Sequence, residues 1–183
     1  MNTPDVLPVF STPDELEQHV WNVLRTIPDP EIPTINLVDL GIIRKVSVAE
    51  KVSEQHEDTP VWHIRVEMMP TFVGCPALDM MRRDIQRILC TCGTVDVKVV
   101  YSEVWTTERI TEAGRTMLQS AGLTPPPRKN VMTLPMYQQA VAHQCPHCGS
   151  QETHLDNLFG PTPCRAIGYC EGCHQPFEQF KAI

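Results

Sequence analysis

Two pairs of cysteines near the carboxyl end constrain this chain more than any other feature. Cys145 and Cys148 form one C-x-x-C pair, and Cys170 and Cys173 form a second about twenty residues later. This spacing is typical of a metal site built from four thiolates. Gly149, directly after the first pair, and Gly172, inside the second, are expected to give the turns their backbone freedom. The sequence therefore predicts a small lobe over residues 145–183 in which metal binding, about 10–16 kcal/mol for zinc, supplies folding free energy.

Zinc is the expected occupant of this four-cysteine site, and iron bound as in rubredoxin is the alternative. Disulfides are disfavoured because paired C-x-x-C turns at this separation rarely occur without a metal. Cys164 is a fifth thiol between the pairs. It could be a substitute ligand, a redox-active thiol or a small buried apolar side chain, and the last is favoured. Because four thiolates complete the coordination shell, the nearby imidazoles are expected at the surface: His143, His147 and His174.

The length and the amino-terminal sequence limit the class of protein. At 183 residues the chain has room for one ordinary domain and a small appendage. No apolar run approaches the roughly 20 residues of a membrane span. The first residues lack the basic start and apolar core of an export signal. Together with thiols in metal-type spacing, these features predict a cytoplasmic protein that has no contact with a membrane.

The charge disfavours nucleic acid as a partner, although metal ribbons often bind it. The formal net charge is −7, and residues 145–183 carry only Arg165 and Lys181 against four acidic residues. A phosphate-binding surface needs the opposite sign. A protein partner is therefore the expectation.

The chain from residue 12 to residue 100 reads as helix, strand, strand, helix, strand. Thr12 can cap a helix that begins at Pro13 and ends by Ile27. Residues 61–68 alternate apolar and polar side chains, which predicts a strand with one buried face. A small α+β sandwich with both helices on one face follows, and then a zinc ribbon. The predicted divisions are a domain over 1–123, a proline-rich linker and approach segment over 124–144, and the ribbon over 145–183.

Cys75 is the second chemical candidate. Pro76 suits the first position of a helix, which places Cys75 at the cap, where the helix dipole and free N–H groups favour thiolate. Such a thiolate could ligate a soft metal, while a structural capping role remains open. Its possible neighbours are Thr71, Asp29, Glu31 and Asp39.

A catalytic nucleophile at Cys75 is disfavoured, because such a thiol needs a histidine base with an orienting carboxylate. The histidines of this domain, His19, His56 and His63, occur in no recognisable partner motif. Cys90 and Cys92, at the end of the predicted helix, are interpreted as small residues near the core.

Several motifs carry a family resemblance. The segments 29–33, 38–42 and 71–76 resemble the SufT-like family of iron–sulfur assembly factors, across about residues 14–105. They read Asp29-Pro30-Glu31-Ile32-Pro33, Val38-Asp39-Leu40-Gly41-Ile42 and Thr71-Phe72-Val73-Gly74-Cys75-Pro76. The segment 105–107, the triproline at 125–127 and the ribbon ending 170–181 extend the resemblance to the PaaD-like family of the bacterial phenylacetate pathway. The order of these motifs is far more specific than any one of them.

This resemblance implies an accessory role beside a multicomponent phenylacetyl-CoA epoxidase, with a di-iron oxygenase and a flavin and iron–sulfur reductase as partners. The implied function is to assist assembly of the iron or iron–sulfur centres, without catalysis by this chain. Cys75 is then the candidate ligand for iron or a cluster, bound transiently, and the four ribbon cysteines hold the structural metal. The chain departs from the family pattern at Ala182, where a cysteine is expected, which weakens a redox pairing of Cys164.

An alternative remains, in which the ribbon docks onto the epoxidase as a scaffold and handles no iron. The sequence leaves open the cluster type, the client protein, and whether iron is bound by one chain or by a homodimer.

Overall fold

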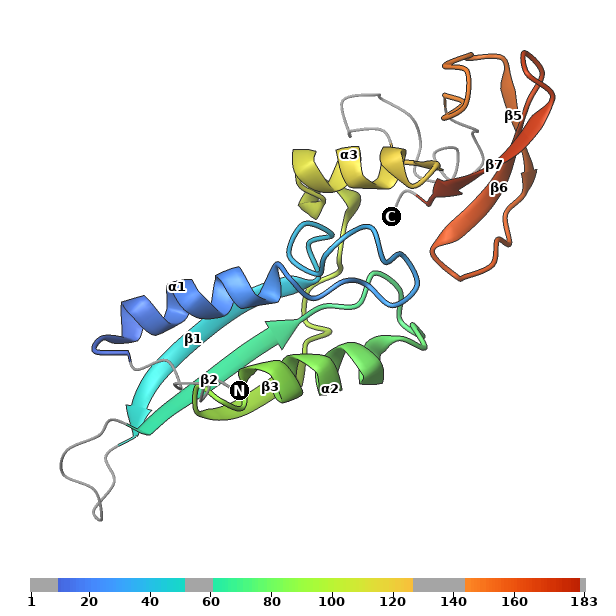
Figure 1. The fold of residues 1–183 in the computed structure, drawn as a ribbon. Coiled ribbons are helices and arrows are strands. Elements are labelled where there is room, and N and C mark those ends of the chain that lie inside the picture. Colours follow the sequence, from blue (N-terminus) through green and yellow to red (C-terminus); the bar gives the residue numbers. More distant parts are fainter. Residues whose placement is uncertain (1–9, 52–60, 127–143, 182–183) are drawn as a thin grey trace, which may run out of the picture.

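The computed structural model describes residues 10–51, 61–126 and 144–181. Most of the predicted linker and approach segment over 124–144 lies outside these residues. Within them, two sheets form, one from each part of the chain (Figure 1). No helix of the described ranges is long and apolar enough to cross a membrane.

The amino-terminal sheet has the order β1-β2-β3. Its strands are β1 (Ile43–Lys51), β2 (Val61–Met68) and β3 (Thr94–Val99). β1 and β2 are antiparallel, whereas β2 and β3 are parallel because a helix connects them. The predicted alternation in β2 is confirmed, since every second residue from Trp62 to Met68 is buried.

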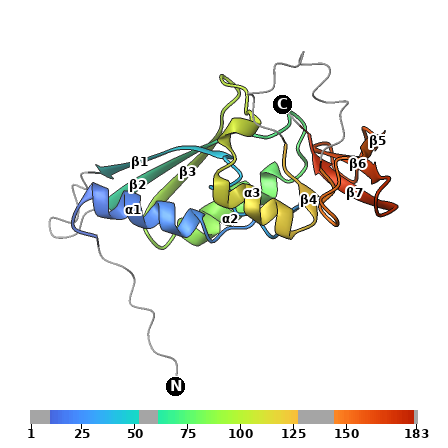
Figure 2. The same ribbon diagram turned by 90° about the horizontal axis from the view of Figure 1, so that it is seen from above.

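Two helices cover one face of this sheet, α1 (Pro13–Leu24) and α2 (Leu78–Leu89), as Figure 2 shows. The predicted start of α1 is confirmed, because the Thr12 hydroxyl accepts a hydrogen bond of 3.2 Å from the Glu15 N–H. The predicted α+β class and the order of these five elements are confirmed as well.

The start of α2 differs from the prediction. The helix begins at Leu78 with Ala77 as its N-cap, not at Pro76 with Cys75 as the cap. The Leu78 N–H donates to the Cys75 carbonyl (3.4 Å), so a tighter turn over residues 75–78 precedes the first full helical turn. Cys75 therefore lies two residues before the cap, in a turn that leads into the helix.

The segment after β3 joins the two parts of the molecule. It forms the short η1 (Thr107–Arg109) and α3 (Glu112–Ser120), which ends before Gly122 at φ 74°. Trp105 is buried; its indole N–H donates to the Leu40 carbonyl (3.2 Å), and its ring lies 5.8 Å from that of Phe180. Trp105 thus contacts both the amino-terminal core and the last strand of the chain.

The carboxyl-terminal sheet has the order β4-β7-β6-β5. Its strands are β4 (Leu123–Thr124), β5 (Thr153–Asn157), β6 (Arg165–Cys170) and β7 (Gln175–Phe180). β4, which straddles the predicted boundary between residues 123 and 124, pairs parallel with β7. Because Cys164 and Phe180 also belong to the large hydrophobic core, the ribbon packs against the first domain. The division of the chain at residue 123 stays a prediction.

Candidate metal centres

The four ribbon cysteines form a compact cluster. The sulfur atoms of Cys145, Cys148, Cys170 and Cys173 all lie within 4.8 Å of one another. The Sγ atoms of Cys145 and Cys173 are 3.7 Å apart, and those of Cys148 and Cys170 are 3.6 Å apart. A tetrahedral site with metal–sulfur bonds of about 2.3 Å has sulfur–sulfur edges of about 3.8 Å. The cluster therefore fits a metal of the zinc type.

The backbone of the two C-x-x-C turns explains this convergence. The Gly149 N–H donates to the Cys145 carbonyl and the His174 N–H donates to the Cys170 carbonyl, each at 2.9 Å. In each pair, the residue after the second cysteine has a left-handed backbone conformation: Gly149 at φ 73° and His174 at φ 56°. The expectation that Gly172 supplies this conformation was wrong, because His174 does so. Gly172 permits close approach instead: a Cβ there would lie 3.1 Å from the Ser150 hydroxyl.

The thiols of the cluster differ in acidity. Burial opposes ionisation of Cys170, but the Cys173 N–H and the neighbouring thiols donate to its sulfur and lower its pKa to about 7. Burial, together with the surrounding sulfurs, raises the pKa of Cys173 to about 12. A cation that binds all four sulfurs must therefore displace protons, which makes its affinity depend on pH.

Cys75 is half-buried in the loop between β2 and α2. Its N–H donates to the Phe72 carbonyl (3.1 Å), which closes the turn, and its sulfur accepts from the Ala77 N–H. Burial is the largest influence on this thiol, and together with the carboxylates of Glu31 and Asp29 it raises the pKa to about 11. The expectation that its position favours thiolate was wrong, because burial and nearby negative charge outweigh the single N–H donor.

Asp29 and Glu31 lie close to Cys75 and belong to the proline-rich turn 28–33. The Asp29 Oδ1 atom accepts from the Glu31 N–H (2.8 Å) and the Ile32 N–H (2.9 Å), so this buried carboxylate builds the turn. Burial raises the pKa of both carboxyl groups. The turn thus brings two acidic side chains into electrostatic contact with the thiol.

The other two expected neighbours have different surroundings. The Asp39 carboxylate accepts from the Asn36 amide and the Thr111 hydroxyl, both at 2.6 Å, and anchors α3 to the 36–41 loop. Thr71 is buried, and none of the hydrogen bonds found among the described residues joins its hydroxyl to Cys75. Neither residue is among the main influences on the pKa of the Cys75 thiol.

Sequence reasoning missed Cys164 and Arg165 as parts of this region. Cys164 is 6% exposed, as expected for a small buried side chain, but it also interacts electrostatically with Cys75, Glu31 and Asp29. The Arg165 guanidinium donates to the Glu31 carbonyl and pairs with the Glu178 carboxylate at 2.8 Å. Only the fold brings the ribbon against the proline-rich turn, so no local motif could have signalled this.

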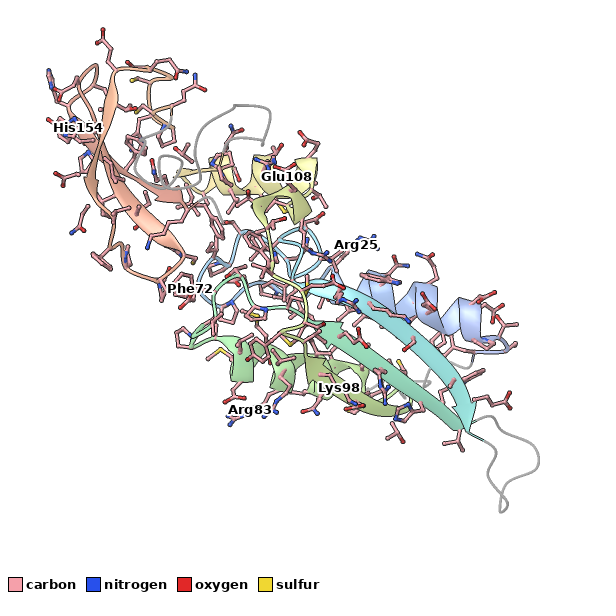
Figure 3. The ribbon with its side chains drawn as sticks, turned by 180° about the vertical axis from the view of Figure 1, so that it is seen from behind. Arg25, Phe72, Arg83, Lys98, Glu108 and His154 are labelled. Atoms are coloured by element: carbon pink, nitrogen blue, oxygen red, sulfur yellow. The ribbon has the colours of Figure 1, made fainter. Side chains whose placement is uncertain are left out.

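A groove runs between the ribbon and the first domain beside this region. Its volume is about 640 Å³, and Glu31, Pro33, Leu123, Arg165 and Phe177 are among the residues that line it. Figure 3 shows labelled Phe72 at the end of the first domain that faces the ribbon, whereas His154 lies on the ribbon itself. Phe72 is 44% exposed and Val73 is 82% exposed, which leaves apolar surface next to Cys75.

Two protein families match separate parts of the chain. The family described as the PaaD zinc beta ribbon domain matches residues 130–181, which include all four clustered cysteines. The family described as iron-sulfur cluster assembly protein matches residues 17–100, which include the proline-rich turn and Cys75.

Individual proteins are similar as well. A protein of Escherichia coli K12, provisionally named as one of the subunits of 1,2-phenylacetyl-CoA epoxidase, is 35% identical, across 90% of this chain and 92% of that protein. A protein of Porphyromonas gingivalis W83 named Fe-S protein maturation auxiliary factor is 29% identical, across 54% of this chain and 86% of that protein. A solved domain of unknown function (DUF59) from Bacillus anthracis is 23% identical, with a TM-score of 0.46, across 57% of this chain and 92% of that one.

Proposed function

The chain belongs to the PaaD-like family of 1,2-phenylacetyl-CoA epoxidase components, and on this premise we propose that it is a non-enzymatic maturation factor for such an epoxidase. Its task is to help assemble or insert the iron or iron–sulfur centres of the oxygenase or the reductase, in the cytoplasm. Cys75 receives the iron or cluster as cargo, and the ribbon cysteines hold zinc as a structural ion.

One observation carries the proposal: the segment that matches the iron–sulfur assembly family holds a half-buried thiol beside two carboxylates. Among the described residues, no set of three or more Cys, His, Asp or Glu groups converges within 4.8 Å except the ribbon cluster. A site at Cys75 with fewer than three converging groups suits transient binding, because coordination positions stay open for a client. The name of the similar maturation auxiliary factor supports the same role.

The ribbon has a separate part in this function. A zinc ion bound by Cys145, Cys148, Cys170 and Cys173 would supply folding free energy to the small lobe and no chemistry. The four side chains hold the two turns together, and β7 carries Phe180 to the first domain. The ribbon thus positions its own residues beside the Cys75 region and offers a surface to the client.

A scaffold that docks without handling iron is the second candidate. It is favoured by the high pKa of Cys75, about 11, which keeps this thiol protonated near neutral pH. The apolar side chains of Phe72 and Val73 would then serve only as docking surface.

The two functions differ in what they predict for Cys75→Ser. The epoxidase oxygenase and reductase should be purified from cells that carry this variant, and their iron content measured. A maturation factor predicts a several-fold loss of iron in at least one of them. Normal iron in both, with normal epoxidase activity, would contradict maturation and leave the scaffold.

Cys90→Ser is the matched control. Cys90 is an exposed thiol of the same domain whose sulfur donates to the Arg87 carbonyl at the end of α2, away from the region of Cys75. This variant should leave the iron content of both client proteins unchanged.

A further inference from the structure

Three large apolar side chains stay exposed close to Cys75 in the sequence. Phe72 is 44% exposed, Val73 is 82% exposed and Met80 is 56% exposed, so the thiol at residue 75 has apolar surface before and after it. The other exposed large apolar residues of the described ranges lie in two loops elsewhere: Tyr101, Val104, Leu158 and Phe159. Exposed apolar side chains that gather in one place mark interaction sites, whereas single ones are ordinary.

The turn that carries two of these apolar residues is held at both ends. Thr71 and Ala77 are buried on either side of it. Within it, the Cys75 N–H donates to the Phe72 carbonyl (3.1 Å). A Cβ at Gly74 would meet no atom within 4 Å, so the outer side of the turn is open. The apolar side chains therefore project from an ordered backbone, and a partner can bind them at little cost in conformational entropy.

The polar side of α2, which follows this turn, carries more positive than negative charge. Its charged residues are Asp79, Arg82, Arg83, Asp84 and Arg87. Each aspartate pairs with the arginine three residues after it, at 3.1 Å and 2.9 Å, which leaves Arg83 without an ion pair among the described residues. Met80 and Arg83 are three positions apart and so share a face of the helix. Figure 3 shows Phe72 at the start of this region and Arg83 on the outer side of α2.

This charge contrasts with the rest of the chain. The formal net charge is −7, and α1 carries three acidic residues without Lys or Arg. The carboxylates closest to Cys75 belong to the turn 28–33, where Asp29 is buried and Glu31 lines the groove at the ribbon. An acidic partner is therefore repelled by most of this protein and attracted over α2, where Arg83 follows the apolar side chains. The surface suits a segment that combines apolar residues with Asp or Glu.

We propose that the client protein docks on the surface formed by Phe72, Val73, Met80 and Arg83, through an apolar segment that carries acidic residues. The inference rests on the proposed function, which supplies the client, and it deepens that function by naming where the client binds. The apolar side chains form the centre of the contact, and Arg83 pairs with a carboxylate at its rim. Docking here places the client beside Cys75, three residues after Phe72.

A matched pair of exposed valines tests the apolar part of this surface. Binding of the full zinc-loaded chain is measured to the purified epoxidase oxygenase and to the purified reductase, each immobilised separately. Val73→Asp should weaken binding to at least one of them roughly tenfold, because it places a charge in the apolar centre. Val104→Asp, at a valine that is 77% exposed on another loop, should bind as wild type does. Zinc content and circular dichroism confirm that each variant is folded.

A matched pair of arginines tests the charge. Arg83→Glu should weaken the same interaction about fivefold, and its binding should depend less on salt than that of wild type. Arg25→Glu changes the net charge of the chain by the same amount at the exposed end of α1, which Figure 3 shows apart from Phe72 and Arg83. This control should bind as wild type does.

The outcomes distinguish this inference from the proposed function. Wild-type binding by Val73→Asp, equal weakening by the two arginine variants, or no binding of the wild type to either protein would each refute the docking surface. The iron content of the client proteins from Cys75→Ser cells decides the proposed function independently of these results. Weak binding by Val73→Asp together with normal iron in those cells would support the docking surface and contradict maturation.

Discussion

At the scale of single residues, the surroundings of Cys75 keep its thiol protonated. Burial is the main cause, and the charges of Glu31 and Asp29 add to it, so that its pKa is about 11. At about pH 8 roughly one molecule in a thousand then carries the thiolate. A metal that binds here must displace a proton, so its apparent affinity should rise as the pH rises.

Replacing Glu31 by Gln should make Cys75 more reactive. Removing this negative charge lowers the pKa of the Cys75 thiol. At a fixed pH below that pKa, a larger fraction of the molecules then carries the thiolate. Because Glu31 is partly exposed, we expect a modest gain, about threefold in the initial rate of alkylation by iodoacetamide near pH 8. The rate is followed for the Cys75 peptide by mass spectrometry.

Glu17→Gln is the matched control for this experiment, because Glu17 lies on α1 and is absent from the influences on Cys75. This variant should leave the rate of Cys75 alkylation unchanged. A slower rate in Glu31→Gln, or an equal gain in the control, would contradict the electrostatic explanation.

At the scale of elements, the turn 28–33 depends on Asp29 as an acceptor and not on its charge. Its Oδ1 atom accepts two backbone N–H bonds, while burial raises the pKa of the carboxyl group. A raised pKa in the folded state means that ionisation opposes folding. This carboxyl group therefore contributes most stability below its unfolded pKa, and the contribution is lost as the pH rises through the folded pKa.

Two substitutions at Asp29 separate the hydrogen bonds from the charge. Asn keeps the acceptor without the charge, so the free energy of unfolding at neutral pH should be equal to or higher than that of wild type. Ala removes the acceptor from two N–H groups and should lower that free energy by about 1–3 kcal/mol. Urea unfolding at neutral and acidic pH measures both effects, and the advantage of Asn over wild type should shrink in acid. An Asn variant as unstable as the Ala variant would refute this account of the turn.

Local patterns predicted most elements, because helix caps and alternation act over a few residues. Thr12 caps α1 as expected, and β2 buries every second side chain. The start of α2 was placed two residues early, because Pro76 fits equally well in the turn that precedes the N-cap. The four-cysteine cluster could be predicted because its spacing encodes its geometry. The Cys75 surroundings could not, because burial and charge there depend on contacts between distant segments.

At the scale of the whole molecule, the ribbon docks on the first domain through contacts that lie outside its metal cluster. The contact between Trp105 and Phe180, the pairing of β4 with β7, and the bond from Arg165 to Glu31 all join the ribbon to residues 31–124 of the chain. None of these residues belongs to the four-cysteine cluster. Docking and metal binding in the ribbon should therefore be separable by mutation.

Phe180→Ala should undock the ribbon and leave its zinc in place. The side chain is fully buried against Trp105, and its loss should lower the stability of the interface by about 3–5 kcal/mol. Zinc content should stay near one ion per chain, since the cluster packs around Phe177 instead. Cys164 should then react with iodoacetamide at a rate at least several-fold above wild type.

Phe159→Ala is the control, at an 82% exposed ribbon residue, and should change neither the zinc content nor the rate of Cys164 alkylation. If Cys164 stays protected in Phe180→Ala with zinc retained, the Trp105–Phe180 contact does not hold the ribbon to the first domain, and Arg165 and β4 must hold it instead.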